Sequence, residues 1–129
     1  MNADLLDLSI ESIVERIRSG AIEPDAVVRC SLERIRRSDG RLRSLISVAD
    51  AVSGPGGSAA GPSASDSGAL AGIPFAVKDN IDVAGFVTTC GWPDWSDAPT
   101  RRSAGMVDAL QKAGAVAVGK ANMPPLAFG

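Results

Sequence analysis

The sequence predicts an α/β fold in which amino-terminal helices precede part of a β-sheet. Two segments near the amino terminus, 9–19 and 24–39, repeat apolar residues at helical spacing. The segment 73–78 instead alternates large apolar residues with smaller or polar ones, as a strand does. A third helical segment, 103–113, and the apolar run 115–119 follow, so we expect a parallel strand–helix–strand unit.

The first two helices have clear expected ends. Ser9 is the expected N-cap of the first helix, because its hydroxyl can accept a hydrogen bond from an unpaired backbone N–H group. Pro24 suits the first position of the second helix, and Gly40 is expected to end that helix. The residues that follow, 45–48, are predicted to form a short strand.

The middle of the chain contains an unusual segment. Residues 53–69 are all Ser, Gly, Pro, Ala or Asp. Such a composition cannot bury a core, so we expect a flexible loop, and we expect residues 1–129 to form the amino-terminal part of a single domain. Further on, Ser103 is the expected N-cap of the third helix, whose apolar face would include Met106, Leu110 and Ala113, with Val107 beside them.

Composition excludes several classes of function. The 129 residues carry a net charge of −2 and only 4% aromatic residues, which disfavours nucleic-acid binding. No apolar run approaches a membrane span, and no secretory signal is recognisable, so a cytoplasmic location is expected. The chain has no histidine, so Ser–His and Cys–His catalysis cannot be built from it alone. Without histidine, and with Cys30 and Cys90 far apart, no metal site is expected.

One motif resembles a phosphate-binding loop. Residues 114–121, GAVAVGKA, fit the pattern G-x-x-x-x-G-K, but Ala121 stands where the loop needs Ser or Thr. The β-branched residues Val116 and Val118 favour extended structure, and the helix precedes the motif instead of following it. We therefore predict a buried strand that ends at Gly119–Lys120, not a nucleotide site.

Lys78, at the end of the strand 73–78, leaves two interpretations open. Lysine, aspartate and asparagine often end a strand and begin a turn, so Lys78 could simply reach solvent. Alternatively, a lysine that loses water there holds its proton less tightly and can act as a base near neutrality. In a chain without histidine, such a base would permit Ser–Lys chemistry.

Three blocks in order resemble the amino-terminal part of the amidase signature family: GIPFAVKDNIDVAG, DAP before a helix, and AGAVAVGKANM. The resemblance implies an α/β fold with a mixed β-sheet covered by helices, of which this chain would form part. It implies cleavage of a carbon–nitrogen amide bond by a Ser–cis-Ser–Lys triad, with Lys78 as the lysine. Neither a metal nor an organic cofactor is implied, and the partner would be a small-molecule amide substrate.

The resemblance also implies what lies beyond these residues. The two serines belong to a glycine- and serine-rich segment downstream, and the 129 residues end before it, so we expect this chain alone to be inactive. The residues Met123, Ala127 and Phe128 would contribute to the substrate-pocket wall. The partner would be the carboxy-terminal portion or a second copy of the chain. The alternatives are a non-catalytic interaction module or truncated remnant, and a protein similar to the catalytic subunit of a tRNA-dependent amidotransferase.

Overall fold

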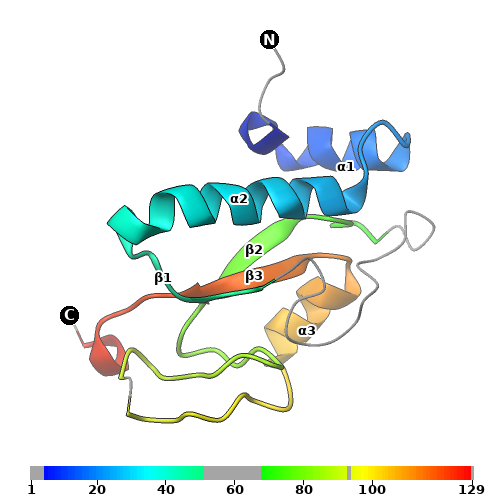
Figure 1. The fold of residues 1–129 in the computed structure, drawn as a ribbon. Helices are drawn as coiled ribbons and strands as arrows, with labels where there is room; N and C mark the ends of the chain where they lie inside the picture. The colour runs from blue at the N-terminus through cyan, green and yellow to red at the C-terminus, as the bar shows by residue number, and fades with distance from the viewer. Residues whose placement is uncertain (1–4, 51–67, 93, 129) are drawn as a thin grey trace.

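Helices and strands follow the expected order along the chain (Figure 1). The computed structural model describes residues 5–50, 68–92 and 94–128, so all but the last two residues of the predicted loop 53–69 lie outside the described residues. The elements are η1 (Leu5–Asp7), α1 (Ile10–Arg18), α2 (Pro24–Leu42), β1 (Leu45–Val48), β2 (Pro74–Lys78), α3 (Gly105–Lys112), β3 (Val116–Ala121) and η2 (Pro125–Ala127).

Helix α1 begins as its sequence predicts. The Ser9 side chain accepts a hydrogen bond from the backbone N–H of Ser12 at 3.2 Å. One face of α1 packs against the start of α2 and the turn before β2, where it closes a small apolar cluster. The buried members of this cluster are Ile13, Val14, Ile17, Val27, Ala71 and Ile73.

Helix α2 is longer than the sequence predicts, because Gly40 does not end it. The helix continues to Leu42, and Arg43 then takes a left-handed conformation with φ of 50°. The end is stabilised by Asp39, whose carboxylate accepts hydrogen bonds from the backbone N–H groups of Ser44 at 2.8 Å and of the next residue at 3.3 Å. The end of α2 is therefore set by the Asp39 side chain, which binds backbone groups just after the helix, and not by the exposed Gly40 in its last turn.

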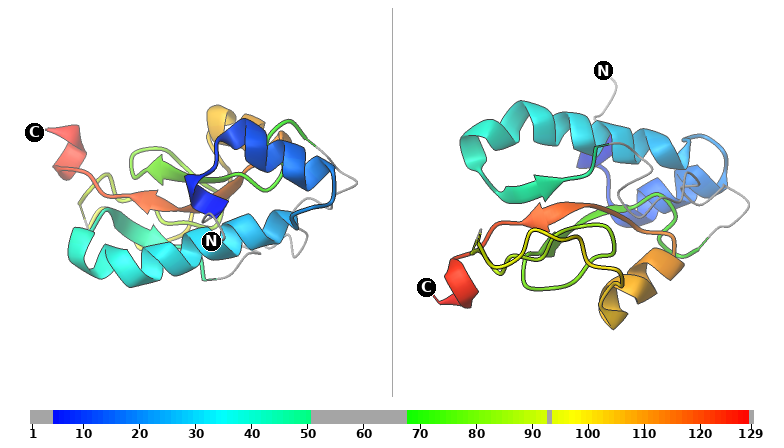
Figure 2. Two further views of the ribbon diagram at one scale, coloured as in Figure 1. Left: turned by 90° about the horizontal axis from the view of Figure 1, so that it is seen from above. Right: turned by 60° about the horizontal axis from the view of Figure 1, so that its bottom comes forward.

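The three strands form one mixed sheet in the order β1-β3-β2. β1 is antiparallel to β3, and β2 is parallel to it, so the predicted parallel strand–helix–strand unit is confirmed. Figures 1 and 2 show α2 along one face of the sheet, and α3 with the loops before it along the other. β3 also extends past its predicted end, and it pairs Lys120 with Val77 and Ala121 with Lys78.

Helix α3 departs from its predicted cap and face. Ser103 is not the N-cap; Ala104 is, and the Ser103 hydroxyl instead accepts a hydrogen bond at 3.0 Å from a backbone N–H in the loop before the helix. The predicted apolar face is also shifted: Met106 is 63% exposed and Leu110 is 38% exposed, whereas Val107, predicted only to adjoin that face, is 2% exposed. The helix is only eight residues long and meets the core mainly through Val107.

The main core lies between α2, the sheet, α3 and the loop after β2. Its buried residues are Val28, Leu32, Ala49, Val77, Val83, Phe86, Val107, Ala117 and Val118. The core therefore packs against both faces of the sheet, with Val28 and Leu32 of α2 on one face and Val107 of α3 on the other. Among the described helices, none is long and apolar enough to cross a lipid bilayer.

Candidate active site

The candidate active site lies where the parallel strands β2 and β3 end side by side. Lys78 is the last residue of β2 and is paired with Ala121, the last residue of β3. The loops that follow the two strands therefore start at the same edge of the sheet. In open α/β sheets, ligands commonly bind beyond the carboxyl ends of the strands.

Lys78 lies at an exposed end of β2. In the observed register it shares a face with Ala76 on its own strand and with Ala121 on β3, as the alternation of the sequence predicts. Both Ala76 and Lys78 are exposed. Within residues 5–50, 68–92 and 94–128, Lys78 is thus not stripped of water, and the described hydrogen bonds and ion pairs do not involve its amine.

Asp79, the next residue, is turned into the protein and has 0% exposure. Its Oδ2 atom accepts hydrogen bonds from the backbone N–H groups of Thr89 at 3.1 Å and Gly91 at 3.2 Å, and from the Thr89 hydroxyl. Its Oδ1 atom lies 3.2 Å from Nζ of Lys120. That contact is an ion pair that lacks hydrogen-bond geometry, so Oδ1 has no hydrogen-bond partner among the described residues.

Lys120 completes this buried group. The lysine is 0% exposed, and its side chain lies on the face of the sheet opposite to Lys78. Nζ donates to the Thr88 hydroxyl at 3.0 Å and to the carbonyl oxygen of Val87 at 3.3 Å. An ammonium group has three N–H donors, and here three oxygens surround it, so its charge is balanced although no water reaches it.

The electrostatics of Asp79 favour the carboxylate. Burial acts to raise the pKa of Asp79, but the hydrogen bonds from Thr89 and Gly91 and the ammonium of Lys120 outweigh it and lower the pKa below 3.8. Asp79 is therefore ionised near neutral pH. Because Oδ2 accepts three hydrogen bonds and Oδ1 faces an ammonium, the carboxylate serves to hold its neighbours in place and is poorly suited to take a proton from a substrate.

The loop held by Asp79 is connected to the carboxy-terminal segment. The backbone N–H of Cys90 donates to the carbonyl of Asp79 at 3.1 Å, and the carbonyl of Cys90 accepts from the N–H of Leu126 at 2.8 Å. Gly91 has a φ of +71°, and a Cβ atom there would lie 2.5 Å from the carbonyl oxygen of Met123. Only glycine fits this close approach without a shift of the backbone.

The residues predicted to line a substrate pocket occupy different environments. Met123 is buried, with 8% exposure, directly behind the loop at Gly91. Ala127, the last residue of η2, is exposed, and Phe128 directly after it is 82% exposed. The described residues place all three on the side of the strand ends, but they do not enclose a pocket around Lys78.

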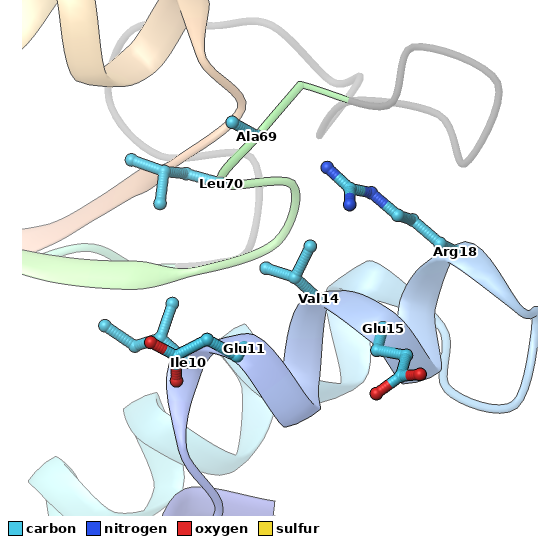
Figure 3. Close-up of a pocket in the computed structure, with 7 residues that line it drawn as sticks. All are labelled: Ile10, Glu11, Val14, Glu15, Arg18, Ala69 and Leu70. Atoms are coloured by element: carbon cyan, nitrogen blue, oxygen red, sulfur yellow. The ribbon is translucent and has the colours of Figure 1, made fainter.

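A hollow of about 530 Å³ lies elsewhere, between α1 and the turn before β2 (Figure 3). It is lined by Ile10, Glu11, Val14, Glu15, Arg18, Ala69 and Leu70. The turn that contains Ala69 and Leu70 precedes β2, whereas Lys78 ends that strand. The hollow therefore lies at the opposite end of β2 and is no part of the candidate active site.

A known protein family matches the part of the chain that contains this site. A family model described as Amidase matches residues 26–129, which include both strand ends and the loops after them. The chain belongs to the amidase family. The matched region contains Lys78, Asp79 and Lys120, so the resemblance of the three sequence blocks to this family is confirmed.

Relatives in the amidase family differ in what they act on. A subunit of the glutamyl-tRNA(Gln) amidotransferase of Chromohalobacter salexigens is 33% identical over 129 residues, which cover 95% of this chain and 26% of that protein. A mandelamide hydrolase of Pseudomonas putida is 52% identical over 60 residues, which cover 46% of this chain and 12% of that enzyme.

Solved structures of other members share the fold of this amidase chain. The corresponding glutamyl-tRNA(Gln) amidotransferase subunit of Thermotoga maritima superposes with a TM-score of 0.74 at 30% identity, covering 97% of this chain and 25% of that one. The native peptide amidase of Stenotrophomonas maltophilia gives 0.73 at 26% identity, covering 96% and 25%. This chain thus spans about a quarter of the length of these relatives.

The buried ion pair of this amidase chain is not predicted from its sequence. The sequence predicts Lys120 at the end of a strand and Asp79 in a turn, without contact between them. A signal is present, because Lys120 stands at the end of a strand that its apolar residues predict to be buried. A lysine in such a strand needs a partner, and Asp79 is the acid that follows the neighbouring strand.

Proposed function

We propose that this chain is the amino-terminal part of an amidase that cleaves a carbon–nitrogen amide bond, with Lys78 as the base of a Ser–cis-Ser–Lys triad. The observation that carries the proposal is the position of Lys78. It is exposed at the end of a parallel strand, inside the region matched by the amidase family. The two serines would come from the part of the protein beyond the 129 residues.

The chemistry requires Lys78 to lose water. The remaining three quarters of an amidase would cover the exposed residues Ala76 and Lys78, and removing water from an amine favours its neutral form. The neutral amine of Lys78 would take a proton from the intermediate serine, which in turn would activate the nucleophilic serine for attack on the amide carbonyl. This chain alone would then be inactive, because both serines of the triad would come from the rest of the protein.

A second candidate function is that of an amidotransferase component. The relatives named as glutamyl-tRNA(Gln) amidotransferase subunits align with nearly the whole chain at about 30% identity, which favours this alternative. Such a protein would use the same lysine to release ammonia from an amide and would work beside other proteins of a complex. The net charge of −2 gives no sign of a tRNA-binding surface within this chain.

A third candidate is a non-catalytic interaction module or truncated remnant. It is favoured by the apolar side chains exposed on the described surface, such as Met106 and Phe128. A module of this kind needs a partner, which would be a second copy or the carboxy-terminal portion. Size-exclusion chromatography of the 129-residue chain tests this, since a stable monomer with well-protected amides would count against a required partner. The cytoplasmic location stays a prediction.

The test of the main proposal uses the complete protein and its variant Lys78→Ala. A fluorophosphonate probe, which reacts with activated serine hydroxyls, avoids the need to know the substrate, and ammonia release from small amides provides a second measurement. We expect labelling of the wild type and loss of labelling in Lys78→Ala, with an unchanged circular dichroism spectrum. Lys112→Ala, at an exposed lysine on α3, is the matched control. Labelling of Lys78→Ala at the wild-type rate would reject the proposal.

A further inference from the structure

We propose that the buried pair of Asp79 and Lys120 is a positioning pair, which holds Lys78 and the segment 123–128 in the geometry that the reaction needs. This inference rests on the proposed amidase function. Neither residue of the pair is expected to touch substrate, because both are 0% exposed and Lys120 lies on the face of the sheet opposite to Lys78. Their effect on the reaction must therefore pass through other residues.

The first path leads to Lys78. Lys78 stands between Val77 and Asp79 in the chain. The Val77 side chain lies in the core, and Val77 is paired with Lys120. The backbone N–H of Asp79 donates to the carbonyl of Ala121 at 3.1 Å, so the ladder between the strands continues one residue past Lys78. The Asp79 carboxylate then fixes the chain on the other side of the sheet. Lys78 is thus held by its neighbours on both sides while its own side chain can face a reacting group.

The second path leads to the carboxy-terminal segment. Polar contacts to the pair hold the loop residues 87–91. The Lys120 ammonium binds Val87 and Thr88, the Asp79 carboxylate binds Thr89 and Gly91, and the backbone carbonyl of Asp79 accepts a hydrogen bond from Cys90. Cys90 in turn accepts the hydrogen bond of Leu126. The loop therefore transmits the position of the pair to residues 123–128, which the family resemblance assigns to the pocket wall.

The type of interaction supports a positioning role. Two charges without solvent contact stabilise a fold poorly, since an apolar pair of similar volume often does as well. An apolar pair could fill the same space beneath β2 and β3. It could not accept hydrogen bonds from the N–H groups of Thr89 and Gly91 or donate hydrogen bonds to Val87 and Thr88. An apolar pair therefore could not fix the loop.

The experiment separates positioning from folding in the complete protein. The variants are Asp79→Asn, Lys120→Met and the double variant, which removes both charges together. The matched control is Asp108→Asn with Lys112→Met, which removes an exposed ion pair of 2.7 Å on α3. Fluorophosphonate labelling rate, thermal melting and amide exchange at Thr89 and Gly91 are measured for each variant.

We expect each single variant to melt earlier than wild type and the double variant to recover most of this loss. Labelling should fall by about 100-fold in Lys120→Met and stay low in the double variant, because a small displacement of a catalytic group has an effect of this size. Amide exchange at Thr89 and Gly91 should be faster in both, and the control should match wild type in all three measurements.

Two other outcomes carry different conclusions. The positioning role is overturned if the labelling rate recovers together with the melting temperature in the double variant. It is also overturned if the labelling rate of Lys120→Met stays within about threefold of wild type. Both outcomes leave the amidase proposal intact. Labelling that is insensitive to Lys78→Ala overturns the amidase proposal itself, and the positioning role with it.

Discussion

Lys78 and Lys120 lie one position apart on neighbouring parallel strands, with their side chains on opposite faces of the sheet. Val77 is the residue paired with Lys120, and Lys78 is paired with the residue after it. Lys78 is exposed, whereas Lys120 has 0% exposure and an aspartate 3.2 Å away. Two lysines at the ends of neighbouring strands thus have different environments. Lys120 is buried and paired with a carboxylate, whereas Lys78 is exposed and unpaired among the described residues.

The role of Lys78 as a base predicts a specific effect of Lys78→Arg. Arginine keeps the positive charge and the length of the side chain but does not lose its proton in proteins. Fluorophosphonate labelling of the complete protein should therefore fall as far in Lys78→Arg as in Lys78→Ala, by at least about 100-fold. Labelling of the arginine variant near the wild-type rate would show that the site needs a cation and not a proton acceptor.

The low pKa of Asp79 predicts a sensitivity of the fold to acid. A carboxylate with a folded-state pKa below its usual value stabilises the fold above that usual value, and this contribution is lost as the pH falls through the folded-state pKa. Urea unfolding of the 129-residue chain should therefore show a free energy of unfolding that declines below about pH 4. In Asp79→Asn with Lys120→Met, this decline should be shallower.

Asp39 provides the control for the acid experiment. A hydrogen bond from the Ser44 hydroxyl lowers the pKa of Asp39 as well, so part of the acid sensitivity should remain in the Asp79 variant. Asp39→Asn should remove that part. An identical pH dependence in wild type and in Asp79→Asn with Lys120→Met would contradict the role given to the buried pair.

The close contact at Gly91 predicts that Gly91→Ala destabilises the chain. The left-handed φ of +71° and the 2.5 Å separation between a new Cβ and the Met123 carbonyl oxygen both oppose the substitution. The expected loss is about 1–3 kcal/mol in the free energy of unfolding, measured by urea titration. Gly40→Ala, in open space within α2, is the control and should be neutral or slightly stabilising. Equal stability of the two variants would be inconsistent with the described loop.

The two faces of α3 predict opposite sensitivities. Val107 is 2% exposed and Met106 is 63% exposed, so Val107→Ala should cost about 1–3 kcal/mol in the 129-residue chain and Met106→Ala less than about 0.5 kcal/mol. In the complete protein, Met106→Ala should become clearly destabilising if the rest of an amidase covers this face. Thermal or urea unfolding of both variants in both forms of the protein provides the measurement.

Much of the local structure could be predicted from the sequence, because it depends on nearby residues. The cap at Ser9, the alternation that ends at Lys78 and the parallel strand–helix–strand unit all follow from short-range patterns. The end of α2 could not be predicted in the same way. Gly40 is a common stop signal, but the Asp39 carboxylate binds backbone groups beyond the helix and carries it to Leu42.

The environment of the candidate site depends on contacts between distant parts of the chain. The sequence places Lys78 at a strand end, but the partners of Asp79 come from residues 89 and 91 and from β3, which no local pattern connects. The buried face of α3 is shifted from the predicted one for a related reason. A helical pattern shows which residues share a face, but only the neighbours of the helix decide which face is covered.

The order β1-β3-β2 has a consequence for how the polypeptide matures on the ribosome. The central strand is the last of the three to be synthesised, and among the described residues both earlier strands pair only with it. Until residues 116–121 leave the exit tunnel, the nascent polypeptide can therefore form α1 and α2 but no part of this sheet. Two strand segments with unpaired backbone groups would wait during that interval, which is when we expect chaperones to bind the growing polypeptide.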